Sequence, residues 1–193
     1  REKYGELGVE WVPTNGVVET LRMVKDAEEI ASIRAACGIA DATFAHIQLF
    51  MQPETVELDV AMELEWFMRR QGARRPAFES IVASGENSAI PHAEPGERRF
   101  RAGDLVTLDF GAEVDGYTSD ITRTVVIGRA NAEQRRIYET VLEAQLRAIE
   151  GIRPGVRGAD IDAIARQVIT DAGYGKHFTH SLGHSLGLSV HDG

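Results

Sequence analysis

Two aspartates occur in one stretch that has the pattern of a β-hairpin. Residues 108–128 read LDFGAEVDGYTSDITRTVVIG, with an Asp-Gly pair at 115–116 that favours a two-residue turn. A turn at this pair places Asp109 opposite Thr122. Because strand side chains alternate between faces, Asp109 and Asp120 then share one polar face as diagonal neighbours, roughly 7–8 Å apart at the backbone.

The other face of the predicted hairpin is mostly apolar. Its first strand carries Val106, Leu108 and Phe110 on this side, and we expect them to pack on helices. A shift of one residue in the pairing would turn each strand's aspartate into the apolar face, so the register set by the turn is favoured.

Two carboxylates on one partly covered face repel each other unless a positive charge lies between them. The aspartates can pair with Arg123 or point into water. They can share a proton, as in aspartic proteases, although the Asp-Thr-Gly setting of those enzymes is absent. They can also bind one or two divalent metal ions, which requires further histidine or acidic ligands elsewhere in the chain.

Three of the six histidines lie close together near the end of the sequence. His180, His184 and His191 occur in THSLGHSLGLSVHDG. The glycines at 183 and 187 indicate a backbone that passes close to another group, which favours a ligand role for His184. The segment is not the helical His-Glu-x-x-His zinc motif, since no glutamate follows the first histidine.

The remaining histidines and the single cysteine have different settings. His92 lies in IPHAEPGER just before the hairpin, and it is a candidate for the same site. His46 and His177 have no such context and are expected to be structural. Cys37 lies in a helical pattern without a nearby histidine, so we expect it to pack and not to act as a catalytic thiol. One cysteine forms no intramolecular disulfide, which favours a reducing, cytoplasmic setting.

Composition argues against several classes of function. The chain has 193 residues, 43% of them hydrophobic, which is enough to bury a sizeable core. No stretch approaches the roughly 18 uninterrupted apolar residues of a membrane span. A net charge of −9 argues against nucleic acid or an anionic membrane as the main partner.

Periodicity predicts helices and strands in alternating groups. The order indicates an α+β domain of two similar halves, with the second half incomplete. The expected elements are a possible strand at 17–24, a helix from 25 to the residue before Pro53, a helix capped by Thr55 and ending near Gly72, a strand running into a polar loop within 78–92, the hairpin, a helix within 130–152, a helix from near Asp160 to Gly173, and the start of further strands.

Several motifs together resemble the pita-bread metallopeptidases, which include methionine aminopeptidase, aminopeptidase P and prolidase. The motifs are VTLDFGAEVDGYTSDITRTVVIG, HSLGHSLGLSVHD and IPHAEPGERRFRAGD. LRMVKDAEEIASIRAA resembles the junction into the catalytic domain of the proline-specific members. Methionine aminopeptidases usually have GD around the second aspartate where this chain has SDITRT, so the Xaa-Pro branch is the more similar one.

The resemblance implies the pita-bread fold, an antiparallel sheet covered by helices, and a role for each matching residue. Asp109 would bind one metal ion, Asp120 would bridge two, and His184 would bind the other. His92 and His191 match histidines that contact substrate and stabilise the tetrahedral intermediate. The further matches are an active-site histidine, His180, and a residue lining the substrate pocket, Tyr117.

The implied reaction is hydrolysis of an N-terminal Xaa-Pro bond in peptides or dipeptides by a hydroxide held between two divalent ions. Mn²⁺ is the expected metal, with Co²⁺ or Zn²⁺ as alternatives. Two other hypotheses remain: a non-catalytic peptide- or protein-binding module on the same fold, and a creatinase-like hydrolase without metal. Asp109 and Asp120 argue against the metal-free hydrolase, which lacks them.

The resemblance is incomplete at both ends of the chain. Residues 1–23 match only the last stretch of a creatinase-like N-terminal domain and its linker, and residues 24–193 match part of the catalytic domain. Two glutamate ligands that the family carries downstream have no counterpart. We therefore expect a piece of a longer protein with weak metal binding, little activity, and a homodimer that covers exposed apolar surface.

Overall fold

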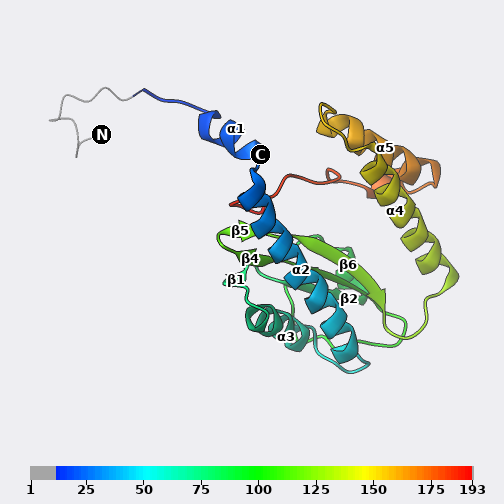
Figure 1. Cartoon of the computed structure of the whole chain (residues 1–193). Helices are drawn as coiled ribbons and strands as arrows, with labels where there is room; N and C mark the ends of the chain where they lie inside the picture. Colours follow the sequence, from blue (N-terminus) through cyan, green and yellow to red (C-terminus); the bar gives the residue numbers. More distant parts are fainter. Residues whose placement is uncertain (1–11, 193) are drawn as a thin grey trace.

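The computed structural model describes residues 12–192, and Figure 1 shows its arrangement. Short sheets lie beneath helix α2, and α4 and α5 lie side by side beyond them. The elements in chain order are α1 (Val17–Met23), α2 (Ala27–Phe50), α3 (Glu57–Arg70), β1 (Arg75–Pro76), β2 (Ile81–Ser84), η2 (Gly85–Ala89), β3 (Leu105–Phe110), β4 (Ala112–Val114), β5 (Tyr117–Thr118), β6 (Ile121–Val126), α4 (Ala132–Gly151), α5 (Gly158–Asp171) and η3 (Gly175–His177).

The predicted hairpin register is confirmed. Asp109 pairs with Thr122 in the β3–β6 ladder, and β4 pairs with β5 in the same register. The turn residues Asp115 and Gly116 have φ values of 51° and 87°. Positive φ at both central positions is the type I′ conformation, whose twist matches that of the flanking strands.

The hairpin is divided between two sheets, which the sequence pattern did not predict. Its tip belongs to the sheet β1-β4-β5 and its base to the sheet β2-β3-β6, both antiparallel. The division occurs at Gly111, where an added Cβ would overlap the carbonyl oxygen of Ser119. The buried Ser119 hydroxyl accepts the N–H of Ala112 at 2.9 Å and donates to the carbonyl of Ala36 at 3.1 Å, which ties the division to α2.

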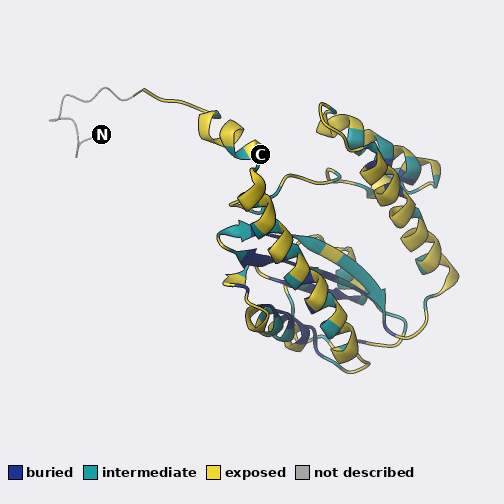
Figure 2. Ribbon diagram, viewed as in Figure 1, coloured by how far each residue is buried: buried dark blue, intermediate teal, exposed yellow. Residues whose placement is uncertain are grey.

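The apolar face of the hairpin packs against α2 and α3, as predicted. Figure 2 shows the buried residues concentrated in the strands and α3, while the outer sides of the helices are exposed. The side chains pointing away from this core therefore lie on the far side of the sheet from α2 and α3. The fully buried members of the core include Ala36, Ala40, Ile47, Val60, Leu64, Met68, Val82, Phe100, Val106, Leu108 and Phe110.

The two long helices before the sheets begin in different ways. Asp26 caps α2, and its carboxylate accepts the N–H groups of Glu28 and Glu29 at 2.9 Å. The prediction that Thr55 caps α3 is wrong, because the cap is Val56 and it contributes no side-chain hydrogen bond. The first N–H groups of α3 instead donate to the carbonyls of residues 98 and 96, so the loop before β3 takes the place of a cap.

The strand predicted at 17–24 is wrong, since residues 17–23 form α1. A strand requires a neighbouring strand for its backbone hydrogen bonds, and none pairs with this segment among residues 12–192. Gly16, at φ 73°, precedes the helix, and the Thr20 N–H donates to its carbonyl at 3.0 Å. Local hydrogen bonds thus satisfy the backbone where no sheet partner is present.

Helices α4 and α5 pack mainly against each other. Ala144 and Ala148 of α4 lie buried against Ala165 and Ile169 of α5, and α5 begins at Gly158, slightly before the position predicted. Residues 178–192 form no strand, contrary to the expectation of further strands after α5. One face of α4 remains exposed, as Figure 2 shows. Its exposed apolar residues are Ile137, Tyr138, Val141, Leu142, Leu146 and Ile149.

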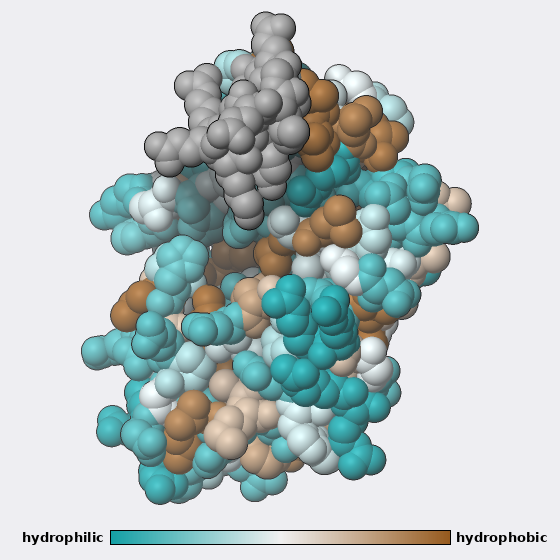
Figure 3. Space-filling model, turned by 90° about the vertical axis from the view of Figure 1, so that its left-hand side faces the viewer, coloured by the Kyte–Doolittle hydropathy of each residue, from teal (hydrophilic) through white to brown (hydrophobic). Residues whose placement is uncertain are grey.

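The surface is mixed in character. On the face drawn in Figure 3, hydrophobic residues occur in separate small groups among hydrophilic ones. Within residues 12–192, no helix combines the length and apolar character needed to cross a bilayer.

Candidate metal centre

The two aspartates lie on the side of the sheet that faces away from the core. Asp109 is near the end of β3, and Asp120 immediately precedes β6. Thr122, opposite Asp109 in the ladder, donates its hydroxyl hydrogen bond to Asp109 Oδ1 at 3.1 Å. The predicted convergence of the two acids is therefore present, and Thr122 holds the orientation of one of them.

Electrostatics at this pair favour a bound proton or cation. Burial raises the pKa of Asp109 to about 6, with a further contribution from the negative charge of the adjacent Asp120. The repulsion between the ionised carboxylates calls for a counter-charge, which a divalent cation between them would supply.

Arg123 does not supply that counter-charge. Its guanidinium lies 5.8 Å from the ring centroid of Phe44 on α2, on the opposite face of the sheet, and donates to the Thr122 carbonyl at 2.9 Å. The interpretation in which the aspartates pair with Arg123 is therefore wrong.

His184 is the histidine brought to the aspartates. Its Nε2 lies 3.4 Å from Asp120 Oδ2. Its Nδ1 lies 3.1 Å from the carbonyl oxygen of Ser185, which can only accept, so Nδ1 carries the hydrogen. In the neutral ring the Nε2 lone pair then points toward Asp120, the tautomer that a metal-binding imidazole requires. The ring of His191 packs against His184 with centroids 3.8 Å apart at 31°.

His92 is exposed in the loop between η2 and β3. It contributes a smaller effect of opposite sign at Asp109, whose pKa is raised chiefly by burial and the charge of Asp120. One buried carboxylate, Glu57, which is 1% exposed, connects the end of β2 to the middle of this loop. Glu57 accepts from the N–H and hydroxyl of Ser84 at 2.8 and 2.6 Å and from the Gly96 N–H at 3.3 Å.

His180 and Tyr117 are not brought to the aspartates. His180 is exposed, its Nδ1 binds the Ser181 carbonyl at 2.8 Å, and its ring packs edge-on against Phe178. The Tyr117 hydroxyl donates to Glu29 Oε1 on α2 at 2.7 Å, and this hydrogen bond to a carboxylate raises the pKa of the phenol.

The donor chemistry fits a divalent cation, but the set of donors is small. Two carboxylates and one imidazole are suitable ligands for Mn²⁺, Co²⁺ or Zn²⁺. Within residues 12–192, however, no group of three or more histidine, cysteine or acidic side chains is arranged to enclose a metal ion. The aspartates form one pair, and His184 contacts only Asp120 of the two.

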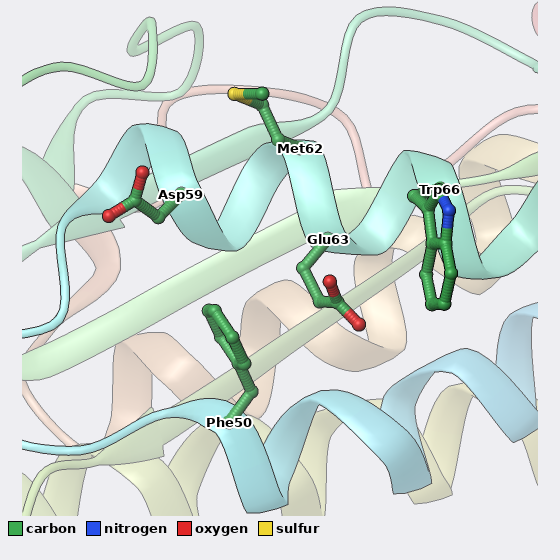
Figure 4. Close-up of a pocket in the computed structure, with 5 residues that line it drawn as sticks. All are labelled: Phe50, Asp59, Met62, Glu63 and Trp66. Carbon is green, nitrogen blue, oxygen red and sulfur yellow. The ribbon is translucent and has the colours of Figure 1, made fainter.

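A separate hollow lies on the other side of the sheet, between α2 and α3. Figure 4 shows the Phe50 side chain of α2 pointing toward α3, and the Glu63 and Trp66 side chains of α3 pointing toward α2. The hollow has a volume of about 380 Å³ and lies apart from the aspartates. Its lining residues are Phe50, Asp59, Met62, Glu63 and Trp66.

Comparison with known proteins decides the family. Residues 31–193 match metallopeptidase family M24. The chain belongs to this family. It is 46% identical over 184 residues to an Xaa-Pro dipeptidase from Pyrococcus furiosus, an alignment that covers 95% of this chain and 53% of the relative. The chain thus spans about half the length of the curated relatives it matches.

Solved structures extend the similarity to the fold. An Xaa-Pro dipeptidase from Bacillus anthracis superposes with a TM-score of 0.96 at 47% identity, covering 98% of this chain and 54% of the other. An X-Pro aminopeptidase from Thermotoga maritima gives 0.89 at 42% identity, covering 91% and 50%. The M24 chain therefore corresponds to about half of the pita-bread structures that it matches, in the Xaa-Pro dipeptidase and prolidase branch, as the motifs predicted.

Sequence reasoning missed several polar residues that hold the M24 site in place. Thr122 was placed opposite Asp109 without its hydrogen bond being predicted. Glu57 had no signal beyond an acidic residue at a helix start. Asp192, directly after His191, is 6% exposed and pairs with Arg22. Its only sequence signal was its position beside a candidate histidine.

Proposed function

We propose that this M24 chain carries part of the active site of a metal-dependent exopeptidase that hydrolyses the N-terminal Xaa-Pro bond of peptides or dipeptides. The observation that carries the proposal is the pair Asp109 and Asp120, which share one face with the pKa of Asp109 raised to about 6 by burial and by its neighbour. His184 lies beside them with Nε2 toward Asp120. The names of the similar proteins, which include Xaa-Pro dipeptidases, support the substrate class.

Three side chains are proposed as metal ligands. Asp109 binds one divalent ion, Asp120 bridges two, and His184 binds the second. Divalent ions in such a site activate a water molecule and act as Lewis acids toward the scissile carbonyl. Mn²⁺ is the proposed metal, with Co²⁺ or Zn²⁺ as alternatives.

The other residues orient these ligands or face the substrate. Thr122 holds Asp109 through its hydroxyl, and the Ser185 carbonyl keeps the hydrogen of His184 on Nδ1. His191, packed on the His184 ring, and His92 are proposed to donate hydrogen bonds to the oxyanion that develops on the substrate.

His180 and Tyr117 are proposed as more distant substrate contacts. His180 stays close to its own segment, and Tyr117 is occupied by Glu29. Both therefore need to turn toward a bound peptide. Substitution of either is expected to raise KM more than it lowers kcat, because their contacts are made to substrate and not to the reacting atoms.

Metal binding by this chain is proposed to be weak. Three side chains leave most coordination positions to water, and the small ligand group seen among the described residues agrees with this. The same observation favours the second candidate, a non-catalytic peptide- or protein-binding module, which needs no enclosed metal ion. We also propose that residues 24–193 form part of the catalytic domain and that residues 1–23 are the remnant of a creatinase-like N-terminal domain and its linker.

Hydrolysis assays separate the two candidates. The chain is incubated with Xaa-Pro dipeptides and with longer Xaa-Pro peptides, each with Mn²⁺ or with EDTA. The exopeptidase proposal predicts slow, Mn²⁺-dependent release of the N-terminal residue, lost in Asp120→Asn and kept in Asp115→Asn. Asp115 lies exposed on the turn of the same hairpin and loses the same charge. Peptide binding without turnover, unchanged by EDTA and by Asp120→Asn, would establish the binding module instead.

A further inference from the structure

A second buried carboxylate, Asp192, lies at the end of the histidine segment. It is 6% exposed. Arg22 of α1 forms an ion pair with its Oδ1, and Lys25 Nζ lies 3.7 Å from its Oδ2. The Arg22 guanidinium also donates to the Ser189 hydroxyl at 3.1 Å. A buried carboxylate is thus balanced by two cations from the segment that leads into α2.

The backbone connects Asp192 directly to the proposed ligand His184. The N–H of Asp192 donates to the carbonyl oxygen of Ser185 at 3.1 Å. The same oxygen accepts the Nδ1 hydrogen of His184 at 3.1 Å. One acceptor therefore fixes both the position of Asp192 and the tautomer and direction of the His184 ring.

The segment between His184 and Asp192 is held by hydrogen bonds to the Asp192 carboxylate and to the sheet. Asp192 Oδ2 accepts the N–H of Leu188 at 3.3 Å. The carbonyl of Gly187 accepts the N–H and hydroxyl of Thr118 at 2.9 and 3.1 Å. An added Cβ at Gly187 would overlap the Asp192 carboxylate, so the loop and the carboxylate fill the same small space.

We propose that Arg22 and Asp192 form a positioning pair that sets the direction of the His184 and His191 rings toward the aspartates. The inference rests on the proposed function, since it assigns the pair a role in metal binding. Arg22 lies before the residues that match the family, 31–193. The ion pair therefore couples a segment outside the matched region to the proposed metal centre.

Loss of Arg22 leaves the buried Asp192 carboxylate with Lys25 as its one remaining cation among the described residues, and loss of the Asp192 charge leaves Arg22 without this ion pair. The loop then relaxes, the Ser185 carbonyl moves, and His184 Nε2 loses its alignment with Asp120. Groups that orient metal ligands typically change metal affinity 10- to 100-fold when removed. We expect Arg22→Ala and Asp192→Asn each to weaken Mn²⁺ binding about 10-fold, and Arg22→Lys, which keeps the charge, to restore most of it.

The test combines Mn²⁺ titration, followed by electron paramagnetic resonance, with NMR of the metal-free protein. Because the His184 and His191 rings are packed, each shifts the ring protons of the other. The expected result is that Arg22→Ala and Asp192→Asn lose these mutual shifts together with affinity, while Arg22→Lys retains both. Arg34→Ala is the matched control, since Arg34 is exposed on α2 and forms no ion pair with any described residue.

The outcomes separate this inference from the proposed function. Unchanged ring shifts and affinity in Arg22→Ala, equal to those of Arg34→Ala, would overturn the positioning pair. Loss of the ring shifts in a protein that binds no Mn²⁺ even in its native sequence would overturn the role in metal binding and the proposed function, while leaving the structural coupling intact. A fall in thermal stability with ring shifts and affinity unchanged would assign the pair to folding alone and also overturn the proposal.

Discussion

Replacing Asp120 with asparagine is expected to stabilise the metal-free protein while weakening its response to metal. In the metal-free state burial and the negative charge of Asp120 raise the pKa of Asp109 to about 6. Asparagine removes one charge, can donate its amide to Asp109, and keeps an oxygen toward His184 Nε2. The two states should therefore change in opposite directions.

The size of the effect follows from the geometry. Diagonal neighbours on adjacent strands lie roughly 7 Å apart at the backbone. Two unit charges at about this separation in an effective dielectric of about 20 repel by about 2 kcal/mol, and solvent screening of these partly exposed groups reduces this to about 1 kcal/mol. For a chain of this length such a gain corresponds to a rise in Tm of about 3 °C. The prediction applies at pH 8, well above the pKa of Asp109, which is raised to about 6.

The assay is urea and thermal unfolding at pH 8, first in EDTA and then in excess Mn²⁺. In EDTA, Asp120→Asn should unfold at higher urea concentration than the native protein, and Asp115→Asn should match the native protein. Mn²⁺ should raise the unfolding free energy of the native protein and of Asp115→Asn, and raise that of Asp120→Asn much less. An Asp120→Asn variant less stable than Asp115→Asn in EDTA would refute the argument that the acids repel each other.

Three other predictions follow from the structure. Because the pKa of Asp109 is raised to about 6, the affinity for Mn²⁺ should rise as the pH increases through 6. Over the same rise, from about pH 4 to pH 6, the contribution of this group to the stability of the metal-free protein should fall. A Kd that is the same at pH 5 and pH 7.5 in calorimetry would contradict the affinity prediction. Gly111→Ala should lower the free energy of unfolding by about 3 kcal/mol, because the added Cβ overlaps the Ser119 carbonyl. The control Gly38→Ala, in an open helical position, should raise it by about 0.5–1 kcal/mol. Equal effects of the two substitutions in urea unfolding would contradict the close approach of Gly111 to Ser119. Self-association through the exposed apolar face of α4 should weaken in Leu146→Glu and persist in Arg147→Gln. A native chain that stays monomeric at all concentrations in light scattering would contradict the expected homodimer.

The sequence predicted the part of the structure that local rules determine. The Asp-Gly turn and strand alternation were sufficient to place Asp109 opposite Thr122 and on the face of Asp120, because a two-residue turn leaves one register. Helix α2 was equally predictable from its periodicity and from Asp26 at its start. The motifs then identified the family, which the matched residues confirm.

The structural features that the sequence did not predict depend on contacts between segments that are distant in the chain. The division of the hairpin at Gly111 arises from its crossing with Ser119 and from the attachment of that serine to α2. The cap of α3 is supplied by a loop about 40 residues later, at positions 96–98, for which no local signal exists. Residues 17–23 form a helix and not a strand, because no strand within residues 12–192 pairs with them. Each depends on tertiary placement and not on residue type.

The candidate site shows the same limit. The hairpin pattern and the motifs identified Asp109, Asp120 and His184 from the sequence, and the fold places the aspartates on one face with His184 Nε2 beside Asp120. The contacts that orient them, from Thr122, Ser185 and the pair formed by Arg22 and Asp192, come from segments that the pattern left unconnected. Buried ion pairs of this kind have no periodic signature.

The central claim is that Asp109, Asp120 and His184 bind divalent metal. The most direct measurement is a crystal structure of the chain soaked in Mn²⁺, with anomalous scattering recorded at the manganese edge. The claim predicts an anomalous peak between the carboxylates of Asp109 and Asp120 and a second within bonding distance of His184 Nε2, both absent in Asp120→Asn. Manganese peaks elsewhere on the protein with none between these carboxylates would contradict it.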